Sequence, residues 1–228
     1  MTEPVTFDAI WEEKYASGHA QRYPWDVVVS FVFRHAPRDR PCQEVAILEV
    51  GCGTASNLWF AAREGFSVAG IDGSASAIDY AKKRFAEDKL EGDLRVGDFT
   101  KLDFPDNSFD CIIDRGALTC CGHSALKRAL AEVRRVLKPG GHFFFNPYAD
   151  SHSSARAGKP AGDGLVKDID AGSLVGAGQI HFVGHQQLIE LMATGWSLHQ
   201  IQRLELTDMV APEGSIHAEW RVIAQKTS

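Results

Sequence analysis

The sequence predicts one α/β domain built on a mostly parallel, doubly wound sheet. Three observations favour this fold. Short apolar runs alternate with segments of helical periodicity, as in strands joined by crossover helices. Gly51 and Gly53 follow the first apolar run, where a strand would turn into a helix. The length of 228 residues is ordinary for a single α/β domain.

The first elements follow from the pattern around these glycines. Residues 45–50 are almost continuously apolar, as expected for a strand buried on both faces of a parallel sheet. A helical pattern at 56–64 ends at Gly65, the residue type that commonly terminates helices. Further strands are predicted at 67–71 and, shorter, at 94–96.

The next elements continue the alternation. Ser74 or Ser76 can cap a helix between the second and third strands, with an apolar face of Ile78, Ala81 and Phe85. A fourth strand is predicted at 109–114. Ser124 can cap the helix that follows, and we expect Lys138-Pro-Gly-Gly141 to end it before a fifth strand at 142–145.

The alternation changes after the fifth strand. Residues 149–179 are rich in Gly, Ser and Ala without sustained periodicity, which predicts a long connection that caps the substrate site. A helix near 186–193 and two strands at 196–206 and 216–225 would then close the sheet. We therefore expect a core at 41–148, a cap at 149–179 and closing elements at 180–228.

The N-terminal 40 residues are expected to form a helical lid. Phe7, Ile10, Trp11 and Tyr15 recur at helical spacing, and residues 27–33 form a second apolar stretch. Helices at this end of the chain would lie beside the open edge of the site.

Composition excludes several classes of protein. The net charge is −6, the pI is about 5.8 and no long basic run occurs, so we expect no nucleic-acid partner. No apolar run approaches the roughly 18 residues of a membrane span, and the acidic N-terminus is unlike a signal peptide. Five cysteines, an odd number, indicate reduced thiols and a cytoplasmic protein with no membrane partner.

The glycine turn carries the strongest functional signal. Asp72 follows Gly51 by about 20 residues, the spacing of a carboxylate that binds ribose hydroxyls. A dinucleotide site would want a further glycine at position 56, which is Ser56. Asp98, with Phe99 beside it, follows the third strand and could accept from an adenine amine. Together these residues favour adenosine recognition without a pyrophosphate.

At this point the chain resembles class I S-adenosylmethionine (SAM)-dependent methyltransferases. The matching stretches occur in the family's order over about residues 45–146; they are Ile47-Leu-Glu-Val-Gly-Cys-Gly-Thr54, Gly70-Ile-Asp-Gly-Ser74, Gly97-Asp-Phe99, Phe109-Asp-Cys-Ile-Ile-Asp114 and Val136-Leu-Lys-Pro-Gly-Gly141. The resemblance implies a seven-stranded sheet with an antiparallel last strand. It also implies SAM as cofactor and S-adenosylhomocysteine (SAH) as product.

The resemblance places a set of side chains and loops around SAM. Glu49 and the glycines would pack on its methionine part, Asp72 on the ribose, and Asp98 with Phe99 on adenine. Ala55 stands where many family members have a third glycine, and we expect it to fit. The cofactor-binding residues that we expect are Tyr15, Tyr23, Glu49, Gly51, Cys52, Gly53, Asn57, Asp72, Gly73, Ser74, Gly97, Asp98, Phe99, Asp114 and Arg115.

Other residues are candidates for the acceptor side. Asp114, His123 and His181 could act as bases, since a hydroxyl or ammonium acceptor must lose a proton. Trp25, Arg115, Tyr148 and His181 could line the acceptor pocket. Each residue has a structural alternative, such as a helix cap or ion pair. Cys120-Cys121-Gly-His123 has metal-binding atoms, but adjacent cysteines chelate one ion poorly, so no metal is expected.

A looser resemblance concerns the acceptor. Trp11-Glu-Glu-Lys-Tyr-Ala-Ser-Gly18, Tyr23-Pro-Trp-Asp26 and Asp114-Arg-Gly-Ala-Leu118 resemble small-molecule methyltransferases of sugars and natural products, and also thiopurine, halide and thiol S-methyltransferases. We expect transfer to a hydroxyl or amine of a small soluble metabolite by a monomer or homodimer. A thiol acceptor, an NAD-binding oxidoreductase and a non-catalytic SAM-binding protein are the alternatives.

Overall fold

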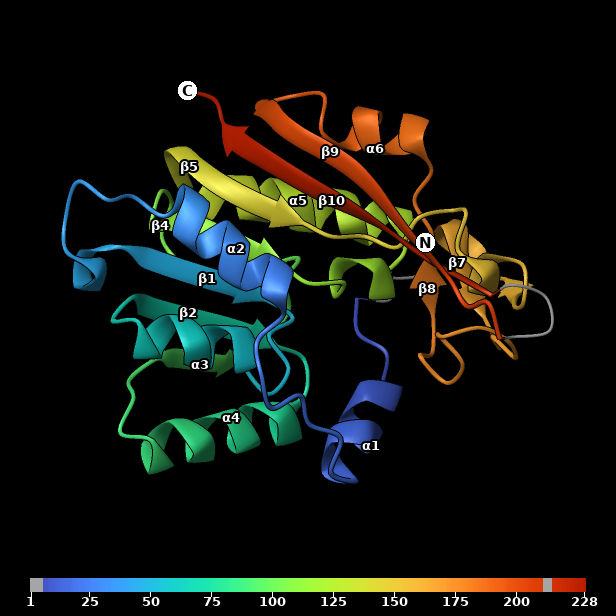
Figure 1. The fold of residues 1–228 in the computed structure, drawn as a ribbon, viewed down its shortest axis with the longest axis horizontal. Helices are drawn as coiled ribbons and strands as arrows, with labels where there is room; N and C mark the ends of the chain where they lie inside the picture. Colours follow the sequence, from blue (N-terminus) through green and yellow to red (C-terminus); the bar gives the residue numbers. More distant parts are fainter. Residues whose placement is uncertain (1–5, 211–214) are drawn as a thin grey trace.

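The computed structural model describes residues 6–210 and 215–228, and its main element is a seven-stranded sheet of order β3-β2-β1-β4-β5-β10-β9 (Figure 1). The first five strands are parallel, while β10 runs antiparallel to both β5 and β9. This confirms the predicted fold class, the seven strands and the antiparallel last strand. The strands are β1 (Ala46–Val50), β2 (Ser67–Asp72), β3 (Asp93–Val96), β4 (Phe109–Asp114), β5 (Leu137–Phe145), β9 (Trp196–Thr207) and β10 (Ile216–Lys226).

Helices cover both faces of the sheet. Figure 1 shows α2 and α3 in front of it and α5 behind. Along β1 the alternation of side chains sends Ile47 into one apolar cluster and Leu48 into the other. The first cluster packs under α2 (Asp26–His35), α3 (Ser56–Arg63) and α4 (Ala75–Glu87), the second under α5 (His123–Val136) and α6 (His185–Leu191).

The strand register brings the predicted motifs to one edge of the sheet. Val50 at the end of β1 pairs with Ile71 of β2 and Asp114 of β4, and Asp72 pairs with Val96 of β3. The carboxyl ends of parallel strands form the edge at which open α/β sheets bind ligands. The glycine turn and the acidic strand ends therefore face the same space.

The predicted helix boundaries are partly correct. Ser74 caps α4, since its hydroxyl accepts from the amide of Ala77 at 3.1 Å. The prediction that Ser124 caps α5 is wrong, because Gly122 is the N-cap and the Ser124 amide instead donates to Asp163. Lys138-Pro-Gly-Gly141 lies inside β5 rather than before it, so this strand begins at Leu137.

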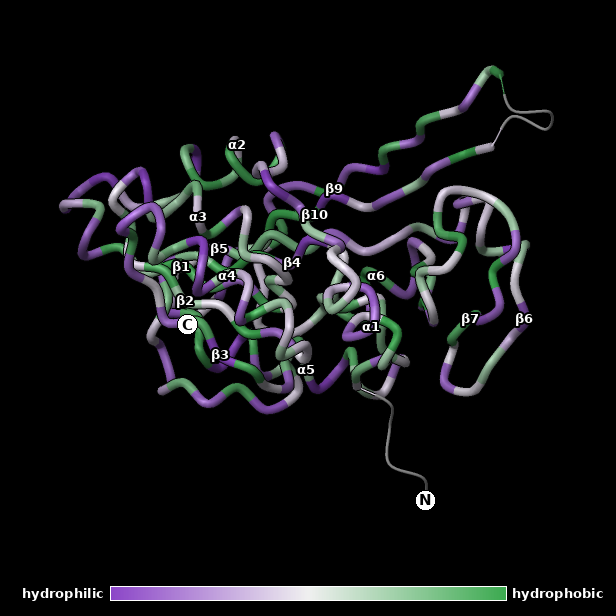
Figure 2. The backbone as a smooth tube through the Cα atoms, turned by 90° about the horizontal axis from the view of Figure 1, so that it is seen from below, coloured by the Kyte–Doolittle hydropathy of each residue, from purple (hydrophilic) through white to green (hydrophobic). Residues whose placement is uncertain are grey.

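The segment 149–179 is more ordered than its composition predicts. It contains two short strands, β6 (Lys159–Pro160) and β7 (Leu165–Lys167), which form a small antiparallel sheet with β8 (Ile180–His181). Figure 2 shows this sheet beside the main body of the molecule. The segment also contains two single helical turns, η3 (Ser153–Ala155) and η4 (Gly162–Gly164). Two more turns of this kind, η1 (Cys42–Glu44) and η2 (Leu118–Cys120), lie in the core. Ile169, Leu174, Ala177 and Ile180 form an apolar cluster of their own.

The N-terminal helix α1 (Ile10–Ala16) is held against the start of α4. Its Glu12 accepts hydrogen bonds from the hydroxyls of Ser74 and Ser76 and from the Ser76 amide. These bonds lower the pKa of Glu12 and place a carboxylate at a helix N-terminus, where negative charge is stabilising. Phe7 lies before the helix, so the predicted helical face of this segment begins only at Ile10.

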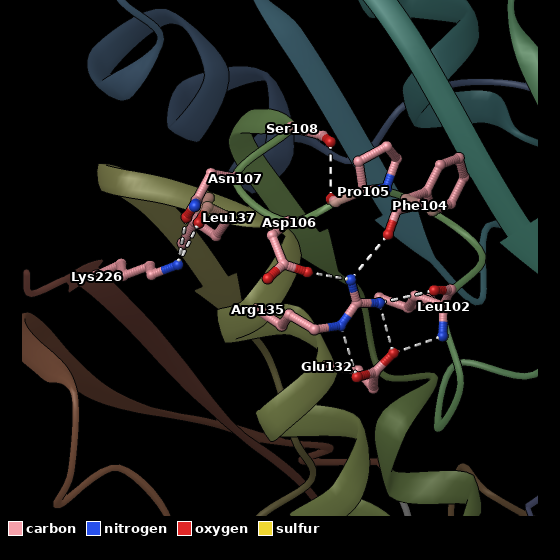
Figure 3. Close-up of polar contacts among 10 residues, drawn as sticks. All are labelled: Leu102, Phe104, Pro105, Asp106, Asn107, Ser108, Glu132, Arg135, Leu137 and Lys226. Carbon is pink, nitrogen blue, oxygen red and sulfur yellow. Dashed lines mark hydrogen bonds and ion pairs between the residues drawn. The ribbon is translucent and has the colours of Figure 1, made fainter.

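One arginine fixes the connection between β3 and β4. Figure 3 shows Arg135 of α5 donating to the Leu102 and Phe104 carbonyls and to the carboxylates of Asp106 and Glu132.

Within the described ranges, no helix is both long and apolar enough to cross a membrane.

Candidate active site

A cavity of about 280 Å³ lies at the carboxyl ends of β1, β2 and β4. Its volume is close to the lower end of the range of about 300–1,000 Å³ for ligand pockets. The core lines one part of it with Gly51, Asp72, Gly73 and Phe99, all of which the sequence predicts. The other part is formed by the loop after β4, the segment 173–180 and the N-terminal segment.

The glycine turn brings backbone close to the carboxylate of Asp72. Gly51 and Gly53 have φ of +64° and +52°, and Gly53 donates its amide to Asp72 Oδ2 at 2.8 Å. The Ser74 amide donates to Oδ1 at 2.9 Å. Burial raises the pKa of Asp72, while these two hydrogen bonds lower it. Each oxygen keeps a second lone pair that could accept from a ribose hydroxyl.

The turn tolerates Ala55 and hides Cys52. Ala55 is buried with φ of +55°, so an alanine occupies the left-handed conformation that usually favours glycine. The Cys52 thiol is buried, and burial raises its pKa. The hydroxyl of Tyr15 lies over the turn, since a Cβ on Gly53 would come 2.5 Å from it.

Glu49 is a buried carboxyl group with one oxygen unused. Its Oε1 accepts from Asn57 Nδ2 at 2.6 Å, whereas Oε2 has no hydrogen-bond partner and the residue is 2% exposed. Burial raises the pKa of Glu49 to about 8. Asn57 in turn accepts from the Trp25 amide at 3.0 Å, which fixes the start of α2. An unpaired buried acceptor fits the ammonium group of a methionine-type ligand.

The predicted adenine contacts are only partly brought together. Phe99 lines the cavity, whereas Asp98 is engaged locally and accepts from the amide and hydroxyl of Thr100 at 2.7 Å and 2.8 Å. Gly97 donates its amide to the Asp72 carbonyl at 2.9 Å, and a Cβ there would lie 2.6 Å from Ile71 Cδ1. Gly97 thus keeps β3 close to β2.

Asp114 is fully buried and its hydrogen bonds are all internal. Oδ1 accepts from the amides of Ala117 and Leu118, each at 2.9 Å, and Oδ2 from the Asn146 amide at 3.4 Å. Burial raises the pKa of Asp114 to about 6. These bonds shape the loop after β4, whose residues Arg115, Gly116 and Ala117 line the cavity.

The predicted acceptor-side residues divide into two places. Arg115 and Tyr148 line the cavity, and the Arg115 guanidinium lies 4.1 Å from the centre of the Trp25 ring. Burial raises the pKa of Tyr148 to about 12. Tyr23, which the sequence predicts to bind the cofactor, is 64% exposed and lies instead beside Arg22 in a separate surface depression.

His123 and His181 meet each other away from the cavity lining. Gln187 Nε2 lies 2.9 Å from Nδ1 of His123 and 2.9 Å from Nε2 of His181. Burial lowers the pKa of His181, and its Nδ1 has no partner. Asp163, which accepts a hydrogen bond from the Ser124 hydroxyl, acts in the opposite direction and raises the pKa of His181.

Sequence reasoning did not assign several residues that line the cavity. Phe7 and Asp8 reach it from the N-terminal segment, and Ser173, Leu174 and Ile180 from the other side. Asp8 Oδ2 accepts from the amide of Gln179 at 2.9 Å, so the two segments meet over the cavity. Among residues 6–210 and 215–228, no three His, Cys, Asp or Glu side chains group in a way that could hold a metal ion.

Comparison with known proteins agrees with this geometry. A family of methyltransferase domains matches residues 47–141. The phthiotriol/phenolphthiotriol dimycocerosates methyltransferase of Mycobacterium tuberculosis is 40% identical over 107 residues, 46% of this chain and 37% of its own length. The cypemycin N-terminal methyltransferase of a Streptomyces species is 30% identical over 165 residues, 71% of this chain and 63% of that protein.

Solved structures share the fold over most of the chain. A SAM-dependent methyltransferase of Methanosarcina mazei matches with a TM-score of 0.69 at 22% identity, over 90% of this chain and 99% of that one. The geranyl diphosphate C-methyltransferase of Streptomyces coelicolor, crystallised with SAH, matches with 0.61 at 16% identity, over 88% and 79%.

The fold, the glycine turn and these matches define the class of protein. The chain contains a class I SAM-dependent methyltransferase domain, and residues 47–141 carry the matching sequence. The chain spans a little over a third of the length of the mycobacterial relative, 37%.

Proposed function

We propose that this protein transfers a methyl group from SAM to a small acceptor, in first place a hydroxyl or amine of a metabolite. One observation carries the proposal: a single cavity joins the glycine turn and Asp72 to a wall formed by Tyr148 and Leu174. Cofactor and acceptor would share this space. Enclosure of the acceptor favours a small molecule over a macromolecule.

The residues present fit SAM. Asp72 has free lone pairs for the ribose hydroxyls, and Phe7 and Phe99 offer aromatic surface for adenine. The unpaired Oε2 of Glu49 suits the ammonium group of the methionine part. Bound SAM supplies a methyl group activated by its positive sulfur.

The protein's own contribution would be positioning. Methyl transfer needs the acceptor atom in line with the bond that breaks and water kept out. Leu174, Ala177 and Ile180 present an apolar wall, and Arg115 and Tyr148 add polar groups at the same end. This mixture favours an acceptor with an apolar body and one protic group.

The same proposal extends to location and assembly. We propose that the protein acts in the cytoplasm as a monomer or homodimer, without nucleic acid or membrane as partner. The acidic pI of about 5.8 and the reduced cysteines support this view. Sedimentation at two salt concentrations, with and without duplex DNA, would test it.

Thermal melting with SAH, and with NADH in parallel, tests the proposed cofactor. A ligand at 100 times its Kd adds about 2.7 kcal/mol to stability, which corresponds to a shift of roughly 5–10 °C for a chain of this size. We expect the shift with SAH alone. A shift with NADH alone would favour an oxidoreductase, and no shift with either would contradict a SAM site.

The Asp72→Ala variant localises the site. Loss of a charged acceptor of hydrogen bonds is worth about 1.5–3 kcal/mol, so SAH affinity should fall by roughly 10- to 150-fold in calorimetry. Asp98→Ala is the matched comparison, because its carboxylate bonds to Thr100. Unchanged SAH binding by Asp72→Ala would remove Asp72 from the site.

A further inference from the structure

A line of polar side chains runs from the acceptor end of the cavity to a buried carboxylate. Ser173 lines the cavity, and its Oγ lies 3.0 Å from Nδ1 of His217 and 3.1 Å from Nε2 of His152. On the far side of the imidazole, Nε2 of His217 lies 3.6 Å from Oε2 of Glu219. Sequence reasoning assigned no role to these four residues, which come from three separate segments.

The contacts at the two ends of this line favour one direction for the hydrogen bonds of Ser173. Nδ1 of His152 accepts from the Ser154 amide at 3.0 Å, so the neutral ring carries its proton on Nε2, facing Ser173. Glu219 faces Nε2 of His217, which favours a proton there and leaves the lone pair on Nδ1. Ser173 can therefore accept from His152 and donate to His217.

The charges around His217 suit a group that gains a proton. Glu219 is 1% exposed and contacts Arg115 at 3.4 Å and Arg221 at 2.8 Å. Burial would raise the pKa of Glu219, but His217 and the two arginines lower it to about 2. An ionised carboxylate behind an imidazole orients the ring and stabilises the imidazolium. The Tyr148 ring stands edge-on to His217, with centroids 5.8 Å apart.

We propose that His217, reached through the Ser173 hydroxyl and held by Glu219, accepts the proton of a hydroxyl-bearing acceptor bound in the cavity. This inference rests on the proposed function and narrows its substrate class to neutral hydroxyl groups. The acceptor O–H bond breaks as its proton moves to Ser173 Oγ, and the Ser173 proton moves to Nδ1 of His217. The acceptor oxygen would take the methyl group in place of that proton as the sulfur–methyl bond of SAM breaks, the electron pair of that bond returns to sulfur, and SAH leaves. The imidazolium later releases the proton to water.

The arrangement distinguishes Ser173 and His217 from the two histidines that the sequence predicts as bases. His123 and His181 bond to Gln187 and do not line the cavity, whereas Ser173 connects His217 to the cavity wall. Since proton removal by a positioned base contributes about 10²- to 10⁴-fold to rate, His217 should matter for hydroxyl acceptors. A thiolate acceptor carries no proton and should not need it.

The first test is the tautomer of His217 in the SAH complex, measured by two-bond nitrogen–proton NMR on the full chain. His217→Gln identifies the signal of this residue. We expect the proton on Nε2 and a bare Nδ1. A proton on Nδ1 would overturn the inference, whatever acceptor the enzyme uses. SAH binding in the same sample separates that outcome from failure of the proposed cofactor site.

The second test compares phenol with thiophenol as acceptor probes, above the pH at which thiophenol ionises. We expect His217→Gln to slow phenol methylation by about 100-fold or more. Thiophenol methylation and the SAH Kd should change less than twofold. His199→Gln, on the exposed face of β9, is the matched control. An equal loss of rate with both probes, or no loss with phenol, would overturn the role of His217 as proton acceptor. If neither probe is methylated, the tautomer of His217 decides whether the inference stands.

Discussion

The ring of Phe7 occupies the space beside Gly73 where a larger residue would place its side chain. A Cβ on Gly73 would lie 2.3 Å from Cδ2 of Phe7 and 2.7 Å from its Cε2. Gly73 follows Asp72 directly, and all three residues line the cavity. The N-terminal segment therefore completes the wall next to the Asp72 carboxylate, for which we propose ribose binding, and glycine leaves room for the ring of Phe7.

Removing this ring should weaken cofactor binding. Phe7 packs beside Gly73 in the segment before α1, so Phe7→Ala removes aromatic surface beside the proposed adenosine site. Aromatic contacts of this kind contribute about 0.5–1.5 kcal/mol, so we expect the SAH Kd to rise roughly 3- to 10-fold. Calorimetry measures this change. Phe33→Ala, an exposed phenylalanine on α2, should leave the Kd unchanged, and equal binding by both variants would argue against the role of Phe7.

The Glu12 contact should control how firmly α1 covers the cavity. Its hydrogen bonds to Ser74 and Ser76 lower the pKa of Glu12, so they contribute above the usual value of 4.5 and are lost as the pH falls through the lower folded value. Glu12→Gln weakens them at neutral pH. We expect faster amide hydrogen exchange in α1 and a higher SAH Kd. The neighbouring Glu13→Gln is the control, and identical exchange in both variants would contradict the prediction.

Much of the fold and half of the site follow from local sequence. The strand 45–50, the glycine turn and Asp72 are contiguous patterns whose period and spacing determine their place at the sheet edge. Parallel pairing of β1 with β2 and β4 then brings them together. Ser74 was predictable as a cap for the same reason, since it lies directly before a periodic helix.

The rest depends on contacts between distant segments. Ser173 and His217 lie in irregular or alternating segments with no motif, and only the fold places them 3.0 Å apart. At the N-terminus of α5, the Ser124 amide donates to Asp163, which is 39 residues away in the sequence. No pattern near Ser124 predicts this contact. Asp98 shows the converse: its motif matches, but its carboxylate turns to Thr100.

Arg135 should be a major contributor to stability. Its guanidinium uses donors on all three nitrogens toward two carbonyls and two carboxylates, a planar arrangement that lysine cannot reproduce (Figure 3). We expect Arg135→Lys to cost about 2 kcal/mol, which lowers the Tm by roughly 4–8 °C. Arg128→Lys, on the exposed side of the same helix, should shift the Tm by less than about 1 °C. Equal Tm values would show that the network is dispensable.

Glu49 links cofactor binding to protons. Its pKa is raised to about 8 by burial, above the usual 4.5, so the folded apoprotein holds a proton there that the unfolded chain has lost. The contribution of Glu49 to the free energy of unfolding is therefore complete below about pH 4.5 and is lost as the pH rises through about 8. An ammonium group beside Oε2 would favour the ionised carboxylate. SAH binding near pH 7 should therefore release protons.

Calorimetry of SAH binding in buffers with different ionisation enthalpies measures that release. We expect the wild type to release a substantial fraction of one proton at pH 7, because a carboxyl group with a pKa near 8 is mostly protonated before binding. Glu49→Gln cannot ionise, so its binding enthalpy should lose most of this buffer dependence, and its Tm should decline less between pH 5 and 8. Glu44→Gln, an exposed glutamate before β1, should behave as the wild type. Proton release that persists in Glu49→Gln would place the titrating group elsewhere and leave the unpaired Oε2 without a cofactor partner.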